Sequence, residues 1–379
     1  TRRFLQRGKR LTVQVLEDRR VLAGMFPGIG GTATFVSEEP TWISSTAEDV
    51  QLGDLDGDGD LDGFVVDGAF GQVWKNDGDA NFTATWRENL IELGRRTSIS
   101  EVELADLDGD GDLDVFSANV GANTVWLNDG QGVFTDSGLR LGDVESTSVD
   151  LGDVDDDGDV DAVVGNWNDL TRVWWNDGSG TFTAGTTFGF EQASAVALGD
   201  LDQDGDLDAA VTYNDRPSRI WFNASSRARF TSSLRIDVAG SDDVQIGDLD
   251  NDGDEDLFFG RSIAGQHDYW AYEDGEFVGV GNGDNTSYGW AALADLDGDA
   301  DLDVFRSATD DQHVLINDGG QFAPRSQPVA AGLRSFALGD LDGDGDIDAL
   351  LGTSTQVGVW FNADVVLTAE VAAVVPAAS

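Results

Sequence analysis

Aspartates recur at alternate positions in seven nine-residue segments of this 379-residue chain. Six of the seven segments read Asp, apolar residue, Asp, any residue, Asp, Gly, Asp, any residue, Asp; the remaining one differs only at the Gly, and the first copy is DLDGDGDLD. Because side chains at the odd positions of such a loop converge on one point, and carboxylates are hard oxygen ligands, the pattern predicts one cation site per loop. We call the segments loops 1–7; they span Asp54–Asp62, Asp106–Asp114, Asp153–Asp161, Asp200–Asp208, Asp248–Asp256, Asp295–Asp303 and Asp340–Asp348.

The sixth position of the loop requires a left-handed backbone, which glycine adopts without strain. Loop 6 has Ala300 at this position, where a side chain costs about 1–2 kcal/mol, so we expect its site to be the weakest. Without a cation the carboxylates of each loop repel one another. The alternative, acidic turns that serve solubility alone, does not account for seven copies in register.

Strands are expected on both sides of every loop. In repeat three, residues 149–152 (VDLG) alternate in polarity before the loop, and residues 162–165 (AVVG) form an apolar run after it. A third run carries Trp in six of the seven repeats and often ends in Asn-Asp-Gly, which predicts a hairpin with both turn residues at positive φ. A Phe-containing fourth strand follows. We interpret the repeated Trp residues as packing between neighbouring repeats.

The repeat spacing of 45 to 52 residues and the lack of a helical period predict an all-β fold. We expect a seven-bladed β-propeller of four-stranded antiparallel blades with one calcium loop per blade. Repeat seven ends after three strands, whereas residues 31–37 read as a strand without a repeat. Pairing of residues 31–37 with 358–362 would close the ring; a β-solenoid, the alternative, has shorter repeats and capping ends.

On these residues, the repeats over 31–362 resemble the FG-GAP/VCBS family, the calcium-loop blades of integrin α-subunit propellers. An EF-hand is excluded because it needs an acid at position 12, where loops 1 and 2 have Val65 and Ser117, and because strands flank each loop. Together with the odd-position geometry, the resemblance implies up to seven Ca²⁺ ions, held by the side chains at positions 1, 3, 5 and 9 and the backbone carbonyl of position 7. The expected metal residues are Asp54, Asp56, Asp58, Asp60 and Asp62; Asp106, Asp108, Asp110, Asp112 and Asp114; Asp153, Asp155, Asp157, Asp159 and Asp161; Asp200, Asp202, Asp204, Asp206 and Asp208; Asp248, Asp250, Asp252, Asp254 and Asp256; Asp295, Asp297, Asp299, Asp301 and Asp303; and Asp340, Asp342, Asp344, Asp346 and Asp348.

The composition limits the possible partners. The net charge of −50 makes nucleic acid and anionic lipid poor ligands. No run of 18 apolar residues occurs, so we expect no membrane insertion. There is no cysteine, and hence no disulfide or thiolate metal site. Loops that enclose calcium this weakly usually need the high calcium found outside cells, so we expect an exported protein at the cell surface or beyond it.

Three regions are expected along the chain. Residues 1–30 hold seven of the 22 basic residues and resemble the LEPR-XLL segments of exported bacterial proteins through Leu16–Leu22 (LEDRRVL), with Asp18 in place of Pro and Val21 in place of Leu. The alternative is a disordered basic leader. Residues 31–364 form the FG-GAP/VCBS propeller, and residues 365–379 an Ala/Val-rich tail or linker.

No motif supports catalysis. His267 and His313 are the only histidines, and neither lies in a nucleophile motif. We therefore expect no enzyme, no catalytic residue and no organic cofactor, but a monomeric, calcium-dependent protein-interaction or adhesion module. A lectin-like, carbohydrate-binding propeller is the main alternative and a polysaccharide lyase a less favoured one.

A protein or polysaccharide ligand is expected on the face opposite the calcium loops. Longer and more variable segments gather there, and they carry Trp86, Trp167 and Tyr213. Trp290 is a further candidate outside the repeated Trp series.

Overall fold

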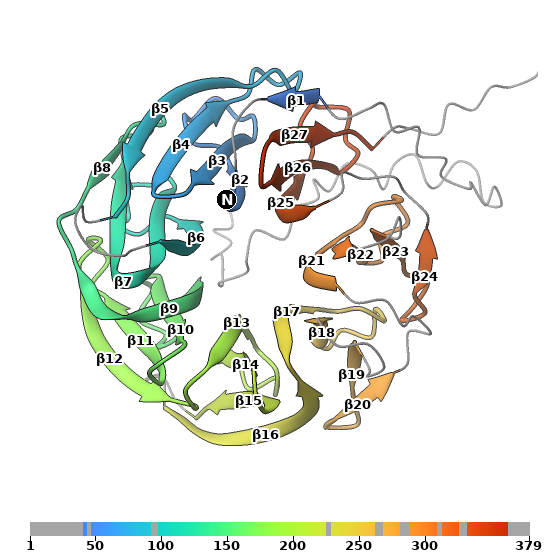
Figure 1. Cartoon of the computed structure of the whole chain (residues 1–379). Helices are drawn as coiled ribbons and strands as arrows, with labels where there is room; N and C mark the ends of the chain where they lie inside the picture. Colours follow the sequence, from blue (N-terminus) through green and yellow to red (C-terminus); the bar gives the residue numbers. More distant parts are fainter. Residues whose placement is uncertain are drawn as a thin grey trace, which may run out of the picture.

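A computed structural model describes residues 41–43, 47–91, 98–224, 229–261, 268–280, 288–308, 313–325 and 332–362. Within these ranges the chain forms strands β1 to β27 and no helix, so none of the described residues belongs to a helix that could cross a membrane. The sheets are arranged around a centre like the blades of a propeller (Figure 1). The basic segment 1–30 and the tail 365–379 lie outside the described residues.

Four of the sheets are built from four consecutive antiparallel strands in the order of the sequence. The strand before an Asp loop lies nearest the centre of the ring, and the strand after the loop pairs beside it (Figure 1). These sheets contain β2 (Asp49–Gly53), β3 (Asp62–Asp67), β4 (Phe70–Lys75) and β5 (Thr83–Asn89); β13 (Ala193–Gly199), β14 (Asp208–Tyr213), β15 (Pro217–Asn223) and β16 (Phe230–Ala239); β17 (Ser241–Gly247), β18 (Asp256–Arg261), β19 (Tyr269–Glu273) and β20 (Glu276–Val280); and β21 (Tyr288–Ala294), β22 (Asp303–Ala308), β23 (Val314–Ile316) and β24 (Ala323–Arg325).

Repeats two and three share one seven-stranded sheet. The predicted second and third strands of repeat two fall in one long element, β7, around a turn in which the Asn119 backbone N–H donates to Asn123 Oδ1 at 2.9 Å. This turn itself pairs with the start of β9, for example Gly121 with Val144, and so joins the two repeats. The strands are β6 (Ile99–Ala105), β7 (Asp114–Asn128), β8 (Phe134–Asp136), β9 (Leu141–Gly152), β10 (Asp161–Asn166), β11 (Thr171–Asn176) and β12 (Phe182–Phe188).

The last sheet joins the two ends of the repeat region. It contains β25 (Leu333–Gly339), β26 (Asp348–Thr353) and β27 (Val357–Trp360), and β27 pairs antiparallel with β1 (Thr41–Ile43). An N-terminal strand therefore completes the sheet of repeat seven, as the ring-closure argument requires. The segment differs from our prediction, because the strand on β27 is Thr41–Ile43; residues 31–37 lie outside the described residues.

The core lies between neighbouring sheets. The second strand of a repeat is apolar on both faces, and every residue of β10, β14 and β26 is buried. The repeated Trp residues pack between repeats, as predicted: Trp126 packs with Leu55 and Phe64 of repeat one, and Trp360 with Phe305 of repeat six. Each sheet therefore depends on its neighbour for burial of its apolar faces.

Candidate metal centre

All seven Asp loops lie between the first and second strands of their repeats, and the ninth residue of each loop begins the second strand. The loops thus occupy the same end of every sheet. The other end of each sheet carries the turns between second and third strands and the connections between repeats.

The carboxylate at position 1 folds the loop backbone around itself. In loop 1, Asp54 Oδ1 accepts from the Gly57 N–H at 2.8 Å, and Asp54 Oδ2 accepts from the Gly59 N–H at 3.1 Å. The second of these bonds, from the N–H of position 6, occurs in all seven loops at 3.0 to 3.1 Å. The carboxylate at position 1 therefore holds the loop backbone in place through hydrogen bonds of the protein alone.

Positions 3 and 5 bring further carboxylates to the same point. In loop 1, one oxygen each of Asp54, Asp56 and Asp58 lie within 4.8 Å of one another; loops 4 and 5 have the same group, and in loops 2 and 3 position 9 replaces position 5. Several of these oxygens are buried and accept no hydrogen bond within the described part of the chain. They are Asp56 Oδ1, Asp155 Oδ1, Asp250 Oδ1 and Asp297 Oδ1 at position 3, Asp200 Oδ1 at position 1, and Asp161 Oδ2 and Asp208 Oδ2 at position 9.

Buried carboxylate oxygens without a donor are costly unless a cation lies against them. Clustered hard oxygens with no nitrogen or sulfur ligand match the preference of Ca²⁺. The residues present therefore fit a calcium ion by the chemistry of the donor set and by the oxygens that the protein leaves without a partner.

The aspartate at position 9 is buried and ties the loop to its sheet. In loop 2, Asp114 Oδ1 accepts from the Asn128 N–H at 2.8 Å and Asp114 Oδ2 from the Leu107 N–H at 3.0 Å. Burial raises the pKa of these carboxyls, to about 7 for Asp114 and about 8 for Asp161, although the backbone donors lower it. A cation in the loop would oppose that shift, because it favours the ionised form.

Position 7 does not point into the cluster. A Cβ atom built on Gly78 would lie 2.7 Å from Asp60 Oδ2, so the Asp60 side chain lies against the hairpin turn of its own repeat. In loop 6, Asp301 Oδ2 accepts from the Gly319 N–H at 2.9 Å in the corresponding turn. This placement agrees with a ligand role through the backbone carbonyl of position 7, although that role itself stays a prediction.

The backbone of position 4 was missed by the sequence reading. It has positive φ in every loop, including 64° at Asp156, 62° at Gln203 and 62° at Asn251. The sequence does indicate this conformation, because six of the seven residues at position 4 are Gly, Asn or Asp, which tolerate a left-handed backbone best. Ala300 at position 6 has φ of 81°, so the left-handed backbone that we predicted at this residue is confirmed.

The Asn that follows the third strand in six of the seven repeats links neighbouring loops, which sequence reasoning also missed; it begins an Asn-Asp-Gly turn in four of these repeats. Its backbone N–H binds the position 9 carboxylate of its own loop, and its Nδ2 donates to the position 2 carbonyl of the preceding loop. Asn76 donates in this way to Leu341 at 2.8 Å, which connects loop 7 to repeat one across the ring closure. The other links are Asn128 to Leu55, Asn176 to Leu107, Asn223 to Val154, Asn317 to Leu249 and Asn362 to Leu296.

The predicted turn geometry is wrong in one respect. Only the glycine of each Asn-Asp-Gly has positive φ, for example 69° at Gly130, and Asp129 does not. Asp129 Oδ1 instead accepts from the Gln131 and Val133 N–H groups at 3.0 and 3.3 Å. The aspartate side chain thus supports a longer turn, which differs from a two-residue hairpin.

The seven loops are not equivalent. Lys75 Nζ lies 2.8 Å from the position 3 carboxylate Asp56, and an Arg325 nitrogen lies 4.0 Å from Asp297. In loop 5 the Tyr269 hydroxyl donates to Asp250 at 3.3 Å. Loops 1, 5 and 6 therefore contain a cationic or hydroxyl donor of the protein that competes for a calcium ligand.

At the opposite end, two of the predicted ligand residues are exposed and two are not. Trp167 is 37% exposed and Trp290 47% exposed. Tyr213 is fully buried and accepts from the Trp221 indole N–H at 3.1 Å, so its prediction as a surface anchor is wrong. Trp86 packs against Phe64, Trp126 and Phe134, which makes it mainly a core residue.

Of the two histidines, His313 is buried, with Nδ1 3.0 Å from the Arg306 carbonyl oxygen, whereas His267 lies outside the described residues.

The family model for FG-GAP-like repeats matches this chain at residues 54–117, 106–164, 153–211, 200–259 and 295–351. Each matched segment begins at the first aspartate of one loop and contains the next loop. Because the matches cover well over half of the chain, the protein belongs to the FG-GAP-like repeat family.

No curated protein matches the sequence. Solved structures show the same fold at low identity. BBS1N in a complex with ARL6DN, soaked with mercury, matches with a TM-score of 0.59 and 11% identity over 87% of this chain and 98% of that one. A lectin from Agrocybe aegerita, described as recognising non-reducing terminal N-acetylglucosamine, matches with a TM-score of 0.53 and 18% identity over 83% of this chain and 90% of that one.

Proposed function

We propose that this protein is an exported, seven-bladed, calcium-binding β-propeller that serves as a protein-interaction or adhesion module. The seven-stranded sheet counts as two blades, one built from β6, β7 and β8 and the other from β9 to β12. With the other five sheets it supplies one blade per Asp loop.

The observation that carries the calcium proposal is the set of buried carboxylate oxygens that accept no hydrogen bond from the residues that the structure describes. In loop 3, Asp155 Oδ1 at position 3 and Asp161 Oδ2 at position 9 are both of this kind. We assign the ligands as the side chains of positions 1, 3, 5 and 9 and the carbonyl of position 7. When bound, calcium neutralises these carboxylates, while position 9 continues to hold the loop on its sheet.

A structural role for the ion follows from the links between loops. Asn176 joins Asp161 of its own loop to the Leu107 carbonyl of loop 2. An ion that orders one loop therefore also orders the acceptor for the next blade. Calcium acts on the ring as a whole, which suits a module that works where calcium is abundant.

The interaction face is assigned to the end opposite the loops. Exposed Trp167 lies there, in the turn after β10, and Trp290 lies on β21. Large exposed aromatic side chains are typical anchors of protein and carbohydrate ligands. We assign no catalytic role, and the lyase alternative gains no support from the buried His313.

The lectin alternative is favoured by one specific observation, the likeness in fold to a lectin that recognises N-acetylglucosamine. A glycan array separates a carbohydrate ligand from a protein ligand, and release of unsaturated uronates from polyanionic polysaccharides tests the lyase.

The experiment for the interaction role is capture of the calcium-loaded protein by intact cells of its source, with and without chelator. Combined Trp167→Ala and Trp290→Ala changes are expected to abolish capture and to leave the calcium-bound melting temperature unchanged. Asn168→Ala, an exposed change in the same turn as Trp167, is the matched control. Capture that survives loss of both tryptophans, or that ignores chelation, would contradict the proposed face or the calcium requirement.

A further inference from the structure

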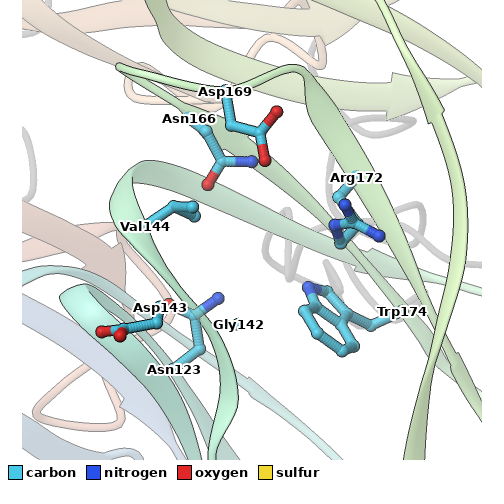
Figure 2. A pocket seen from close by; sticks show the side chains of 8 residues that line it. All are labelled: Asn123, Gly142, Asp143, Val144, Asn166, Asp169, Arg172 and Trp174. Atoms are coloured by element: carbon cyan, nitrogen blue, oxygen red, sulfur yellow. The ribbon is translucent and has the colours of Figure 1, made fainter.

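A hollow of about 230 Å³ lies where repeats two and three meet (Figure 2). Its lining comes from the turn of β7, the start of β9, the turn after β10, and β11. These segments lie at the end of the sheets opposite the Asp loops. The site exists because the β7 turn pairs with β9, a pairing that the other described sheets do not share.

Gly142 keeps an aromatic surface accessible in this hollow. It has φ of 73°, and a Cβ atom at this position would lie 3.4 Å from the Trp174 ring. A residue with a side chain would be strained there and would also cover the indole. The Trp174 ring and Arg172 lie on one side of the hollow, across from Asp143 (Figure 2).

Three donors face the hollow without a protein acceptor in the described ranges. Asn123 is 1% exposed, and its Oδ1 accepts from the Asn119 N–H, which leaves Nδ2 directed into the hollow (Figure 2). The Trp174 indole N–H has no acceptor among the described residues, and Arg172 forms no ion pair with them. The Arg172 guanidinium lies 5.7 Å from the Trp174 ring centroid.

In repeat two, the protein itself supplies an acceptor for the equivalent indole N–H. There the equivalent indole N–H, of Trp126, donates to Thr124 two residues earlier on the same strand, at 3.3 Å. In repeat three the residue two before Trp174 is Arg172, which cannot accept a hydrogen bond. The donor that repeat two satisfies internally is thus left for an external acceptor in repeat three.

Acceptors lie on the remaining walls. Asp169 Oδ1 accepts from the Leu170 N–H at 2.8 Å, and the rest of its carboxylate faces the hollow, whereas the Asp143 carboxylate points away from Trp174 and Arg172 (Figure 2). Asn166 is fully used by the protein, since it accepts from Ser146 and donates to Leu170 at 2.7 Å, and so holds the turn in place. The hollow therefore offers separate donors and acceptors around one aromatic edge.

A ligand for this site must accept from amide, indole and guanidinium groups and also donate to the Asp169 carboxylate. Sugar hydroxyls do both at once, whereas an anion is opposed by two carboxylates and a metal ion by the guanidinium. The volume is below the ~300–1,000 Å³ of sites for drug-sized molecules and suits a single ring. Trp167 is exposed beside the hollow, and its backbone N–H donates to the Glu145 carbonyl, so its side chain can stack on an adjoining unit.

We propose that this hollow binds one pyranose unit of a neutral saccharide. The inference rests on the lectin-like form of the proposed function, because it gives the ligand-binding end a carbohydrate as its partner.

The test is titration of the calcium-loaded protein with methyl glycosides of glucose, galactose, mannose and N-acetylglucosamine, followed by saturation-transfer NMR and calorimetry. We expect at least one glycoside to bind with a Kd in the millimolar range, and Arg172→Gln to weaken that binding at least tenfold. Arg219→Gln is the matched control, because Arg219 occupies the same place in repeat four but donates to Ser233 at 2.9 Å. Arg219→Gln should leave glycoside binding unchanged.

Absence of binding by all four glycosides at tens of millimolar, or equal binding by wild type and Arg172→Gln, overturns the site. Preference for a uronate over the neutral sugars overturns the assigned ligand class. The calcium-dependent melting temperature is measured on the same samples. A calcium response without glycoside binding rejects only this inference, whereas loss of the calcium response rejects the proposed function.

Discussion

The two ends of the sheets differ in how far the repeats agree. At the loop end, the ninth aspartate accepts from the same backbone N–H in all seven repeats, at 2.7 to 2.8 Å. At the other end, repeats two and three carry Thr124 and Arg172 at equivalent places, and the threonine hydroxyl both donates and accepts whereas the guanidinium only donates. Uniform chemistry at one end suits a shared structural task, and divergent chemistry at the other suits the recognition role that we propose for it.

Chelation should produce the largest effect at the loop end. Each filled site contributes about 2.7 kcal/mol when calcium exceeds its Kd a hundredfold, and removal also leaves the carboxylates of each loop to repel one another. Thermal melts with calcium and with chelator should differ strongly in midpoint. Identical midpoints would show that the loops are ordinary acidic turns.

Within one loop, position 9 should matter more than position 7. Asp114→Ala removes the acceptor of two buried N–H groups, each of which costs about 1–3 kcal/mol when unsatisfied. Asp112→Ala, the matched change at a partly exposed residue of the same loop, should cost much less. Chemical denaturation in the presence of chelator measures both; equal losses would contradict the structural role of position 9.

The pH dependence should reverse between the two forms. Without calcium, the pKa of Asp161 is raised to about 8 and that of Asp62 to about 6, above the ordinary value, so the folded state binds more protons than the unfolded state. The stability that these groups contribute is present at low pH and is lost as the pH rises through about 6 to 8. The calcium-bound form should instead lose stability on acidification, because protons compete with the ion.

Melts of both forms from pH 5 to 8.5 measure these slopes. A chelated protein that gains stability as the pH rises through this range would contradict the burial of the position 9 carboxylates.

The smallest effect concerns the one loop without glycine at position 6. Because Ala300 has φ of 81°, Ala300→Gly should tighten loop 6 by up to about tenfold, which is 1.4 kcal/mol. Ala323→Gly on the exposed strand β24 of the same repeat is the control and should not tighten it. Unchanged calcium affinity in Ala300→Gly would refute the strain argument.

Features that depend on local periodicity could be predicted from the sequence. The strands around each loop, the Trp packing between repeats and the left-handed backbone at Ala300 follow from residues close in sequence. The link from Asn128 to the Leu55 carbonyl spans 73 residues, and no local pattern distinguishes it from a turn signal. The burial of Tyr213 could likewise not be predicted from the sequence, because it depends on a contact with Trp221 across a hairpin.

The closing strand shows a similar limit. Residues 31–37 match the pattern of an outer strand, yet Thr41–Ile43 pairs with β27. Outer strands are short and weakly patterned, so their register is set by the sheet that receives them.

The central claim, that the Asp loops hold calcium, is tested most directly by counting the ions. Native mass spectrometry of the chain after calcium saturation, with equilibrium dialysis for affinity, should show several calcium ions per chain, up to seven. The sites lost first on dilution should belong to loops that contain a competing donor or Ala300. A chain that carries no calcium, or a single ion, at millimolar calcium would contradict the account.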